Sequence, residues 1–322
     1  MQSTTLLLLA VEGSLPKPDA AIFADTGWEP RAVYDHLDRL EAVAKDAGIP
    51  VYRVGRGRLP DDVLDPHRHA TIPAYTINPD GSRGMIGRRC TGRYKVEPIE
   101  RQVRLLLGAV ARTRDCRYCD ATGIRIAPWN AKGDEPAELA GPCSVCRGTG
   151  RRAIVGPVPK GAHAEQWIGF STDETQRVTT NGFPKYVTPT FPLLDPLRYS
   201  RGDCKRWLIS RGWFEVPKSA CVGCPLHGNA MWRRMRTYDP ESWRQAIAFD
   251  RAFRSGDGLR AMRFLHSSRL PLDEAPISRV SNREWDASQS DIYDALTEDG
   301  DPDGCSPYGC RSGRPTPEEE PA

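Results

Sequence analysis

Four of the ten cysteines form two C-x-x-C pairs, Cys116/Cys119 and Cys143/Cys146, separated by 23 residues. Each pair is followed four residues later by a glycine, so the two units are near copies of one another. A C-x-x-C turn places two thiolates on one ion, and two such turns complete a tetrahedral site with four cysteine ligands. The spacing therefore predicts a zinc site of the ribbon or paired-knuckle type.

The segment around these cysteines has two interpretations. It shows little apolar periodicity, so the metal could act only as a staple for a segment that lacks a core of its own. Its arginines could instead contact nucleic acid; they are Arg114, Arg117, Arg125, Arg147, Arg151 and Arg152. Each half also resembles the C-x-x-C-x-G-x-G units of the cysteine-rich region in Hsp40-type chaperones, although Ala121 replaces one glycine. That resemblance implies zinc and nothing more.

Composition places the chain among soluble globular proteins. Its 322 residues are 39% hydrophobic and 27% charged, and the formal charge of +3 is too small to predict a nucleic-acid partner by itself. The longest apolar run, residues 6–11, is too short to span a bilayer, and no basic segment precedes it as in a signal peptide. C-x-x-C pairs in such a chain favour metal or redox chemistry over disulfides. We therefore expect a cytoplasmic protein without a membrane span.

The N-terminal part of the chain alternates helix and strand. The expected order is helix, strand, helix and strand, over residues 3–13, 20–24, 30–48 and 50–54. Ser3 or Thr4 would cap the first helix. Two strands joined by a helix with short links indicate an α/β fold, in which helices cover both faces of a parallel sheet. Ligands bind outside the carboxyl ends of such strands, where Asp25, Thr26 and Gly27 fall.

The apolar pattern is interrupted in the middle of the chain. A helix predicted from Pro98 to Val110 is followed by the stretch with both C-x-x-C pairs, and the pattern resumes with a strand at residues 166–170 and a helix from Pro240. The interrupting stretch is interpreted as an inserted module, and the Pro- and acid-rich C-terminal part predicts a mobile tail. The chain thus divides into a first α/β part, the zinc module, a second α/β part and the tail, over residues 1–111, 112–153, 154–270 and 271–322.

Four motifs lie on this scaffold in order. They are FADTGWE at residues 23–29, RRCTGRYKVEPI at 88–99, GFSTDETQR at 169–177 and KSACVGCP at 218–225. Together they resemble the phosphoadenosine phosphosulfate (PAPS) reductase family, in particular its phage and bacterial relatives within the adenine nucleotide alpha hydrolase-like, PP-loop group. The resemblance covers roughly residues 1–110 and 160–255. It implies a Rossmann-like fold for the α/β parts.

The resemblance also implies a site for ATP or a related adenine nucleotide, with Mg²⁺. The positions that match nucleotide-binding residues of the family are Ser3, Thr4, Asp25, Thr26, Gly27, Arg88, Arg89, Asp173 and Glu174. Lys95 and Arg177 would be catalytic cations that neutralise the phosphates. Asp173 and Glu174 could hold Mg²⁺, orient Arg177, or only begin a helix.

The phosphate-binding loop is where the chain departs from the family pattern. That loop is rich in glycine and holds phosphate on backbone N–H groups at a helix N-terminus. The present chain begins Met-Gln-Ser-Thr, which matches only the end of the loop. Either residues are missing from the start, or the loop is truncated and phosphate binding is impaired.

Four further cysteines match iron–sulfur members of the family. With the zinc module removed, Cys90 and Cys221 are roughly ninety residues apart, similar to the ligand spacing in those members, and Cys224 has the Cys-Pro ending of ferredoxin-type runs. Cys204 would supply the fourth ligand of a 4Fe–4S cluster. A second zinc site that uses His227, or unligated thiols, are the alternatives, because four thiolates alone do not distinguish iron–sulfur from zinc.

The C-terminal part contains Cys305 and Cys310, which could form a redox or sulfur-relay pair. The reductases of the family use a C-terminal Glu-Cys-Gly motif, which this chain lacks. We therefore expect α-phosphate activation or sulfur transfer, with a nucleic acid as one class of acceptor, ahead of sulfonucleotide (PAPS) reduction. A non-catalytic, zinc-containing nucleic-acid-binding protein with a degenerate nucleotide site is the third alternative.

Overall fold

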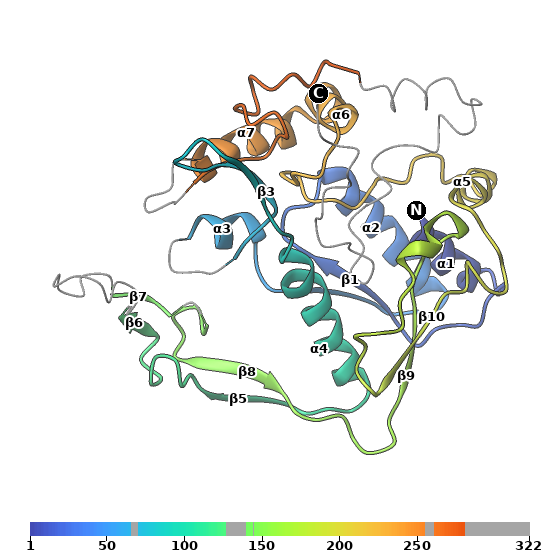
Figure 1. The fold of residues 1–322 in the computed structure, drawn as a ribbon. Coiled ribbons are helices and arrows are strands. Elements are labelled where there is room, and N and C mark those ends of the chain that lie inside the picture. Colours follow the sequence, from blue (N-terminus) through green and yellow to red (C-terminus); the bar gives the residue numbers. More distant parts are fainter. Residues whose placement is uncertain (66–69, 127–139, 144, 255–260, 281–322) are drawn as a thin grey trace.

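The computed structural model describes residues 1–65, 70–126, 140–143, 145–254 and 261–280. The protein is mixed α/β, and its N-terminal part is built on a β-α-β unit (Figure 1). Strand β1 (Ala21–Asp25) leads through helix α2 (Arg31–Asp46) to strand β2 (Val51–Gly55), and the two strands pair in parallel along their whole length. The strand–helix–strand prediction is confirmed.

Helix α2 shows why this part of the chain was predictable. Its buried residues are Val33, Leu37, Leu40 and Ala44, which follow the helical period. Pro30 occupies the N-cap position, and Gly48 has a φ of +70° just past the C-terminus. Both ends therefore carry the residue types that begin and end helices.

Helix α1 (Gln2–Val11) begins earlier than expected. Met1 is its N-cap, so Ser3 and Thr4 lie inside the first turn and neither caps the helix; that prediction is wrong. The helix is buried on most sides, and Leu6, Leu8 and Leu9 each expose 5% or less of their surface. Because apolar residues surround it almost completely, α1 sits in the core instead of covering it.

A second parallel pair lies beside the first. Strand β9 (Ala164–Trp167) pairs with β10 (Val187–Thr190), whereas the sequence predicted a strand at 166–170. Among the described strands, these two are not hydrogen-bonded to β1 or β2. The single parallel sheet that the sequence predicts is therefore observed as two separate two-stranded pairs.

Helices cover both faces of these strands. On one face, Ala24 and Val187 pack with Val103 of helix α4 (Glu97–Leu106). On the other face, Val51 and Trp167 pack against the core around α1. A π-helical turn, Gly92–Val96, leads directly into α4 and carries Lys95 into the interior.

The remaining elements lie in two places: α5 (Arg201–Ser210) packs against α1, whereas α6 (Asn229–Tyr238) and α7 (Pro240–Arg254) pack in the main core together with a third sheet. Strands β3 (Ala74–Ile77), β4 (Arg83–Ile86) and β11 (Met262–Phe264) make this sheet, which is antiparallel with β3 in the middle. The other helices are α3 (Leu59–Leu64) and η2 (Thr172–Arg177, a 3-10 helix). Of all these helices, only α7 was predicted from the sequence. In the part of the chain that the structure describes, no helix has the length and apolar character needed to cross a membrane.

The first residues of the expected tail belong to the folded body. Leu272 and Ile277 expose 0% and 2% of their surface and belong to the main core. The buried carboxylate of Asp250 holds this segment, accepting hydrogen bonds from the backbone N–H groups of Leu265 (3.0 Å) and Leu272 (3.1 Å). A Pro- and Asp-rich composition suggested mobility, but the few apolar residues within it are enough to anchor the segment. Cys305 and Cys310 lie outside the described residues.

The module predicted to bind zinc, called the zinc module below, projects from the body and lies between α4 and β9 in the chain (Figure 1). Strand β5 (Ala111–Asp115) leads out of the body, and β8 (Arg151–Val155) returns antiparallel to it. At the far end, β6 (Ile124–Ile126) pairs with β7 (Ala140–Pro142). The two strand pairs carry the C-x-x-C turns between them.

Candidate functional site

The four cysteines of the zinc module meet at one point. Their sulfur atoms all lie within 4.8 Å of one another, and the side chains are buried. Cys116 Sγ is 3.9 Å from Cys143 Sγ, and Cys119 Sγ is 3.6 Å from Cys146 Sγ. This is the only such group of potential ligands among the described residues. Four clustered thiolates fit a tetrahedral metal ion such as Zn²⁺, so the predicted four-cysteine metal site is confirmed as a geometry.

The two halves of this centre are related by a near repeat in their hydrogen bonds. Thr122 Oγ1 and Thr149 Oγ1 each donate to the carbonyl oxygen of the preceding cysteine at 2.6 Å. Across the halves, the N–H of Cys143 donates to the carbonyl oxygen of Gly123 at 2.7 Å, and that of Cys116 to Gly150 at 2.8 Å. Each half therefore completes the backbone hydrogen bonds of the other.

Close backbone contacts explain why glycine occupies two positions of the repeat. A Cβ at Gly123 would lie 2.2 Å from the carbonyl oxygen of Gly148, and one at Gly150 would lie 2.1 Å from that of Ala121. Ala121 itself has a φ of +61°, whereas the equivalent position in the second half is Gly148, with a φ of +81°. The residue at which the first half departs from the repeat is thus held in a conformation that favours glycine.

A side chain of the second knuckle fixes the module to the body. Arg147 Nη2 is 3.1 Å from Oδ2 of Asp62, and the same carboxylate oxygen accepts a hydrogen bond from the Tyr94 hydroxyl at 2.5 Å. The guanidinium lies against Gly57, where a Cβ would come within 2.2 Å of Nη1. Asp62 is buried. Its contacts with Arg147 and Tyr94 therefore join the module to the π-helical turn that also carries Lys95.

The residues after β1 form a tight turn. The Asp25 carboxylate accepts hydrogen bonds from the Gly27 N–H (2.7 Å) and the Tyr34 hydroxyl (2.9 Å). Burial, together with this bond to Asp25, raises the pKa of Tyr34. Gly27 has a φ of +68°, and a Cβ there would lie 2.9 Å from Cα of Arg58. Asp25 and Gly27 thus shape the turn, and Thr26 points into the protein.

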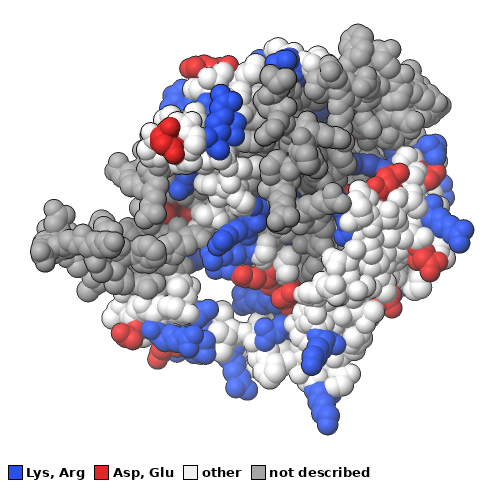
Figure 2. Space-filling view, viewed as in Figure 1, with Lys and Arg blue, Asp and Glu red and all other residues white. Residues whose placement is uncertain are grey.

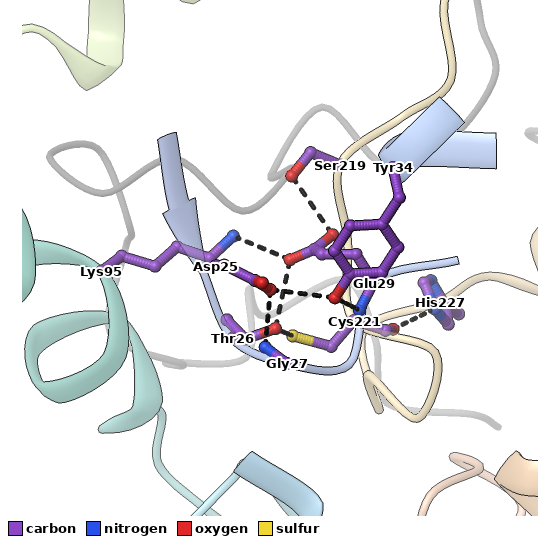
Figure 3. A network of polar contacts seen from close by, with 9 residues as sticks. All are labelled: Asp25, Thr26, Gly27, Glu29, Tyr34, Lys95, Ser219, Cys221 and His227. Atoms are coloured by element: carbon purple, nitrogen blue, oxygen red, sulfur yellow. Dashed lines mark hydrogen bonds and ion pairs between the residues drawn. The ribbon is translucent and has the colours of Figure 1, made fainter. Parts of the chain in front are cut away.

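A buried ion pair lies directly beneath this turn (Figure 3). Lys95 Nζ is 3.8 Å from Oε1 of Glu29, and the two side chains expose 5% and 0% of their surface. Glu29 also accepts hydrogen bonds from Thr26 (3.2 Å) and from Ser219 (3.2 Å). Glu29 and Ser219 were not among the predicted site residues, although both stand inside matched motifs. The sequence signal that could have identified Glu29 as a site residue is its position as an acidic residue next to the turn.

The Cys221 loop packs on the same network. Cys221 Sγ lies 3.2 Å from Thr26 Oγ1, and the Val222 N–H donates to the carbonyl oxygen of Trp28 at 2.8 Å. A Cβ at Gly223 would lie 2.0 Å from the Trp28 ring, so glycine is required there. His227 Nε2 donates to the carbonyl oxygen of Cys221 at 2.9 Å. His227 thus supports the loop. Among the described residues, it does not belong to any group of three or more potential metal ligands.

Three further predicted site residues, Asp173, Glu174 and Arg177, lie near the start of α1. Arg177 and Glu174 form a buried ion pair, and Glu174 accepts a hydrogen bond from Gln2 at 2.7 Å. Glu174 therefore orients Arg177, which was one of the three roles expected of it. Asp173 accepts a hydrogen bond from the backbone N–H of Arg201 at 2.5 Å. This carboxylate caps α5, and it accepts a hydrogen bond from Ser171 at 3.3 Å, whose hydroxyl in turn accepts one from Gln2 of α1 at 3.4 Å.

Thr4 has a structural role that was not predicted from the sequence. Its side chain is buried, and Oγ1 lies 3.1 Å from Nε2 of His36 on α2. Burial lowers the pKa of His36 to about 4, so the imidazole is neutral at neutral pH. The Thr4 hydroxyl joins α1 to α2 and is not directed at a ligand. Ser3 is exposed, as is Arg89, and Arg88 is partly buried.

The four cysteines expected to hold an iron–sulfur cluster do not all meet. Cys204 lies on α5 inside the core around α1, whereas Cys221 belongs to a separate core cluster, against which Cys90 and Cys224 pack. Burial raises the pKa of the Cys204 thiol to about 11. The structure therefore does not support Cys204 as the fourth ligand. Its position is explained by packing, since it occupies an apolar face of α5 with 0% exposure.

Comparisons with known proteins add no relative to this description. Neither protein-family models, nor curated proteins, nor solved structures give a match to the chain.

Proposed function

We propose that the chain is a PAPS reductase-like, PP-loop protein that binds ATP or a related adenine nucleotide and activates its α-phosphate. The observation that carries the proposal is the network in Figure 3. Glu29, Lys95 and Cys221 come from three of the four matched motifs, and they converge where β1 ends. A set of motifs that only resembled the family by chance would have no reason to meet at the carboxyl end of a parallel strand.

The second support is the arrangement around α1. Ser3, Glu174 and Arg177, from two further matched segments, lie at the N-terminus of a ten-residue helix. Helix N-termini attract phosphate through their backbone N–H groups and their dipole. Helices on both faces of the parallel strands agree with the Rossmann-like fold that the proposal requires.

The proposed reaction is the displacement of pyrophosphate. An oxygen of the acceptor attacks the α-phosphorus, the bond from that phosphorus to the bridging oxygen breaks, and pyrophosphate leaves with Mg²⁺. Lys95 and Arg177 are each held in place by a buried carboxylate, so their charges are oriented before the substrate binds. A sulfur nucleophile would then displace the activated oxygen if the protein transfers sulfur.

Metals complete the proposal. Zn²⁺ at the four-cysteine centre holds the module together and takes no part in the proposed reaction. One hydrophobic core contains Cys221, and Cys90 and Cys224 pack against it. This arrangement suits three ligands of a 4Fe–4S cluster, because such a cluster separates its ligands more widely than a single ion does. The fourth ligand would then lie elsewhere.

The test is nucleotide binding and turnover by the full chain. We expect isothermal titration to detect binding of ATP with Mg²⁺, and a coupled assay to detect release of pyrophosphate. Lys95→Met, assayed where circular dichroism shows that it is folded, should lower turnover at least tenfold, and Lys45→Met, at an exposed lysine on α2, should leave turnover unchanged. Absence of binding to any adenine nucleotide would overturn the proposal. Release of sulfite from PAPS with a thiol reductant, and no reaction with ATP, would instead favour the reductase.

A further inference from the structure

The strands that carry the zinc module form a ribbon without a core. Every residue of β5 is exposed, and β5 pairs only with β8. Figure 2 shows Lys and Arg atoms at the lower left, with some Asp and Glu atoms beside them, where Figure 1 draws these two strands. A two-stranded ribbon on its own is marginally stable, so this one depends on the four-cysteine centre at its end and on its contacts with the body.

Strand alternation places three arginines on one face of this ribbon. Arg112 and Arg114 are two residues apart on β5, and Arg152 stands directly opposite Arg114 in the ladder. Like charges at directly opposed positions destabilise a ribbon. None of the three forms an ion pair with another residue of the described chain. The one ion pair on the ribbon, Arg151 to Asp115 at 3.6 Å, lies on the other face.

The cationic face continues onto the first knuckle. The Tyr118 ring is in contact with two guanidinium groups, with its centre 5.4 Å from Cζ of Arg117 and 5.5 Å from Cζ of Arg152. The tyrosine is 42% exposed, and Arg117 is exposed as well. We call this surface the arginine arm: Arg112, Arg114, Arg117, Tyr118 and Arg152.

We propose that the arginine arm binds duplex DNA, with the ribbon lying along the major groove and its guanidiniums on phosphates. Guanidinium groups match phosphate oxygens in charge and in bidentate geometry. Arg112 and Arg114 are separated by about 6.8 Å along the strand, which is about twice the axial spacing of phosphates on one DNA strand. A row of cations at this spacing can contact several phosphates of a polyanion. A single phosphate group would need fewer cations.

The shape of the arm selects the kind of nucleic acid. The major groove of B-form DNA admits a two-stranded ribbon, whereas that of A-form RNA is too narrow and deep for side chains to enter. None of the five residues of the arm belongs to the proposed nucleotide site, so this inference does not depend on the proposed enzymatic activity.

The experiment measures fluorescence anisotropy of a labelled duplex of about 24 base pairs with the full, zinc-loaded chain over a salt series. We expect the logarithm of the affinity to fall with the logarithm of salt concentration with a slope of about −3 to −4, for three or four phosphate contacts. Arg112→Gln/Arg114→Gln should reduce the magnitude of that slope by about two and weaken binding roughly tenfold per lost contact at about 0.1 M salt.

The control is Arg31→Gln/Arg244→Gln, which removes two exposed arginines from α2 and α7 and should leave the slope unchanged. Zinc content equal to that of the unaltered protein will show that each variant keeps its module. An unchanged slope in the arm variant, or binding to the single strand or to duplex RNA as tight as to duplex DNA, would overturn the inference. Pyrophosphate release measured on the same variants separates this outcome from a failure of the proposed activity.

Discussion

Lys95 Nζ lies 3.8 Å from Glu29 Oε1, and both side chains are enclosed by protein. The lysine comes from the π-helical turn before α4, and the glutamate follows the turn at the end of β1. Ser219, from the segment before the Cys221 loop, donates to the second oxygen of the same carboxylate. One buried charge pair therefore ties together three segments that are distant in the sequence.

Removing one partner of this pair should destabilise the protein more than removing both. We expect Lys95→Met to lower the free energy of unfolding by about 3–5 kcal/mol, because it leaves a buried carboxylate without a cation. The double variant Glu29→Gln/Lys95→Met should recover a large part of that loss. Urea denaturation of the two single variants and the double variant measures the coupling. Strictly additive effects would show that the pair does not interact.

The four-cysteine centre should hold one zinc ion per chain. Cys143→Ser should lose that zinc, since only three thiolates remain, and should expose the module to proteolysis while the body stays folded. Elemental analysis of protein purified without oxygen measures zinc, and limited proteolysis locates the change. Zinc retained in full by the variant would contradict the assignment.

The same analysis tests the iron–sulfur proposal. We expect iron and acid-labile sulfide in about equal amounts, about four of each per chain, in the unaltered protein. Cys221→Ser should remove iron and sulfide and leave zinc, whereas Cys204→Ser should leave all three. Protein with zinc and neither iron nor sulfide would exclude the cluster.

Ala121 offers a stabilising substitution. At a φ of +61°, alanine is strained by about 1–2 kcal/mol, and the second half of the module has glycine at the equivalent position. Ala121→Gly should therefore make release of zinc to a chelator slower and the module more stable by about 1 kcal/mol. Gly150→Ala should have the opposite effect, because its Cβ would lie 2.1 Å from a carbonyl oxygen. If the two variants behave alike, backbone conformation does not control the centre.

His36 should make stability depend on pH. Burial lowers its pKa to about 4 in the folded protein, against an ordinary value of 6.5. Between these values the unfolded chain binds more protons than the folded one, so the free energy of unfolding falls as the pH drops from about 6.5 towards about 4. His36→Gln should flatten this part of the profile, and His163→Gln, at an exposed histidine, should not. Urea midpoints at about pH 7 and about pH 5 make the comparison.

The parts that could be predicted from sequence are those whose signals are local. The boundaries of α2 follow from Pro30, Gly48 and a helical period, and the four-cysteine centre follows from spacing. The capping box of α5, Ser200 with Asp203, is a further local signal, although that helix was not predicted.

The contacts that were missed join residues far apart in the chain. The pairing of Arg147 with Asp62 spans 85 residues, and the contact of Thr26 with Cys221 spans 195. Nothing in the local pattern specifies which of many arginines meets which carboxylate, because that choice is made by packing. Cys204 is the opposite case. The sequence suggested it as an iron–sulfur ligand, whereas apolar packing explains its position in the structure.

The zinc module leaves the body and returns to it at neighbouring points. Ala111 pairs with Val155, and the Gly156 N–H donates to the Val110 carbonyl oxygen at 2.9 Å. Neighbouring strands lie about 4.8 Å apart, so a turn of a few residues could replace everything between them without moving α4 or β9. The closeness of these two ends makes the module a unit that could be excised through a single hairpin, and its removal would leave the buried Asp62 without the Arg147 guanidinium.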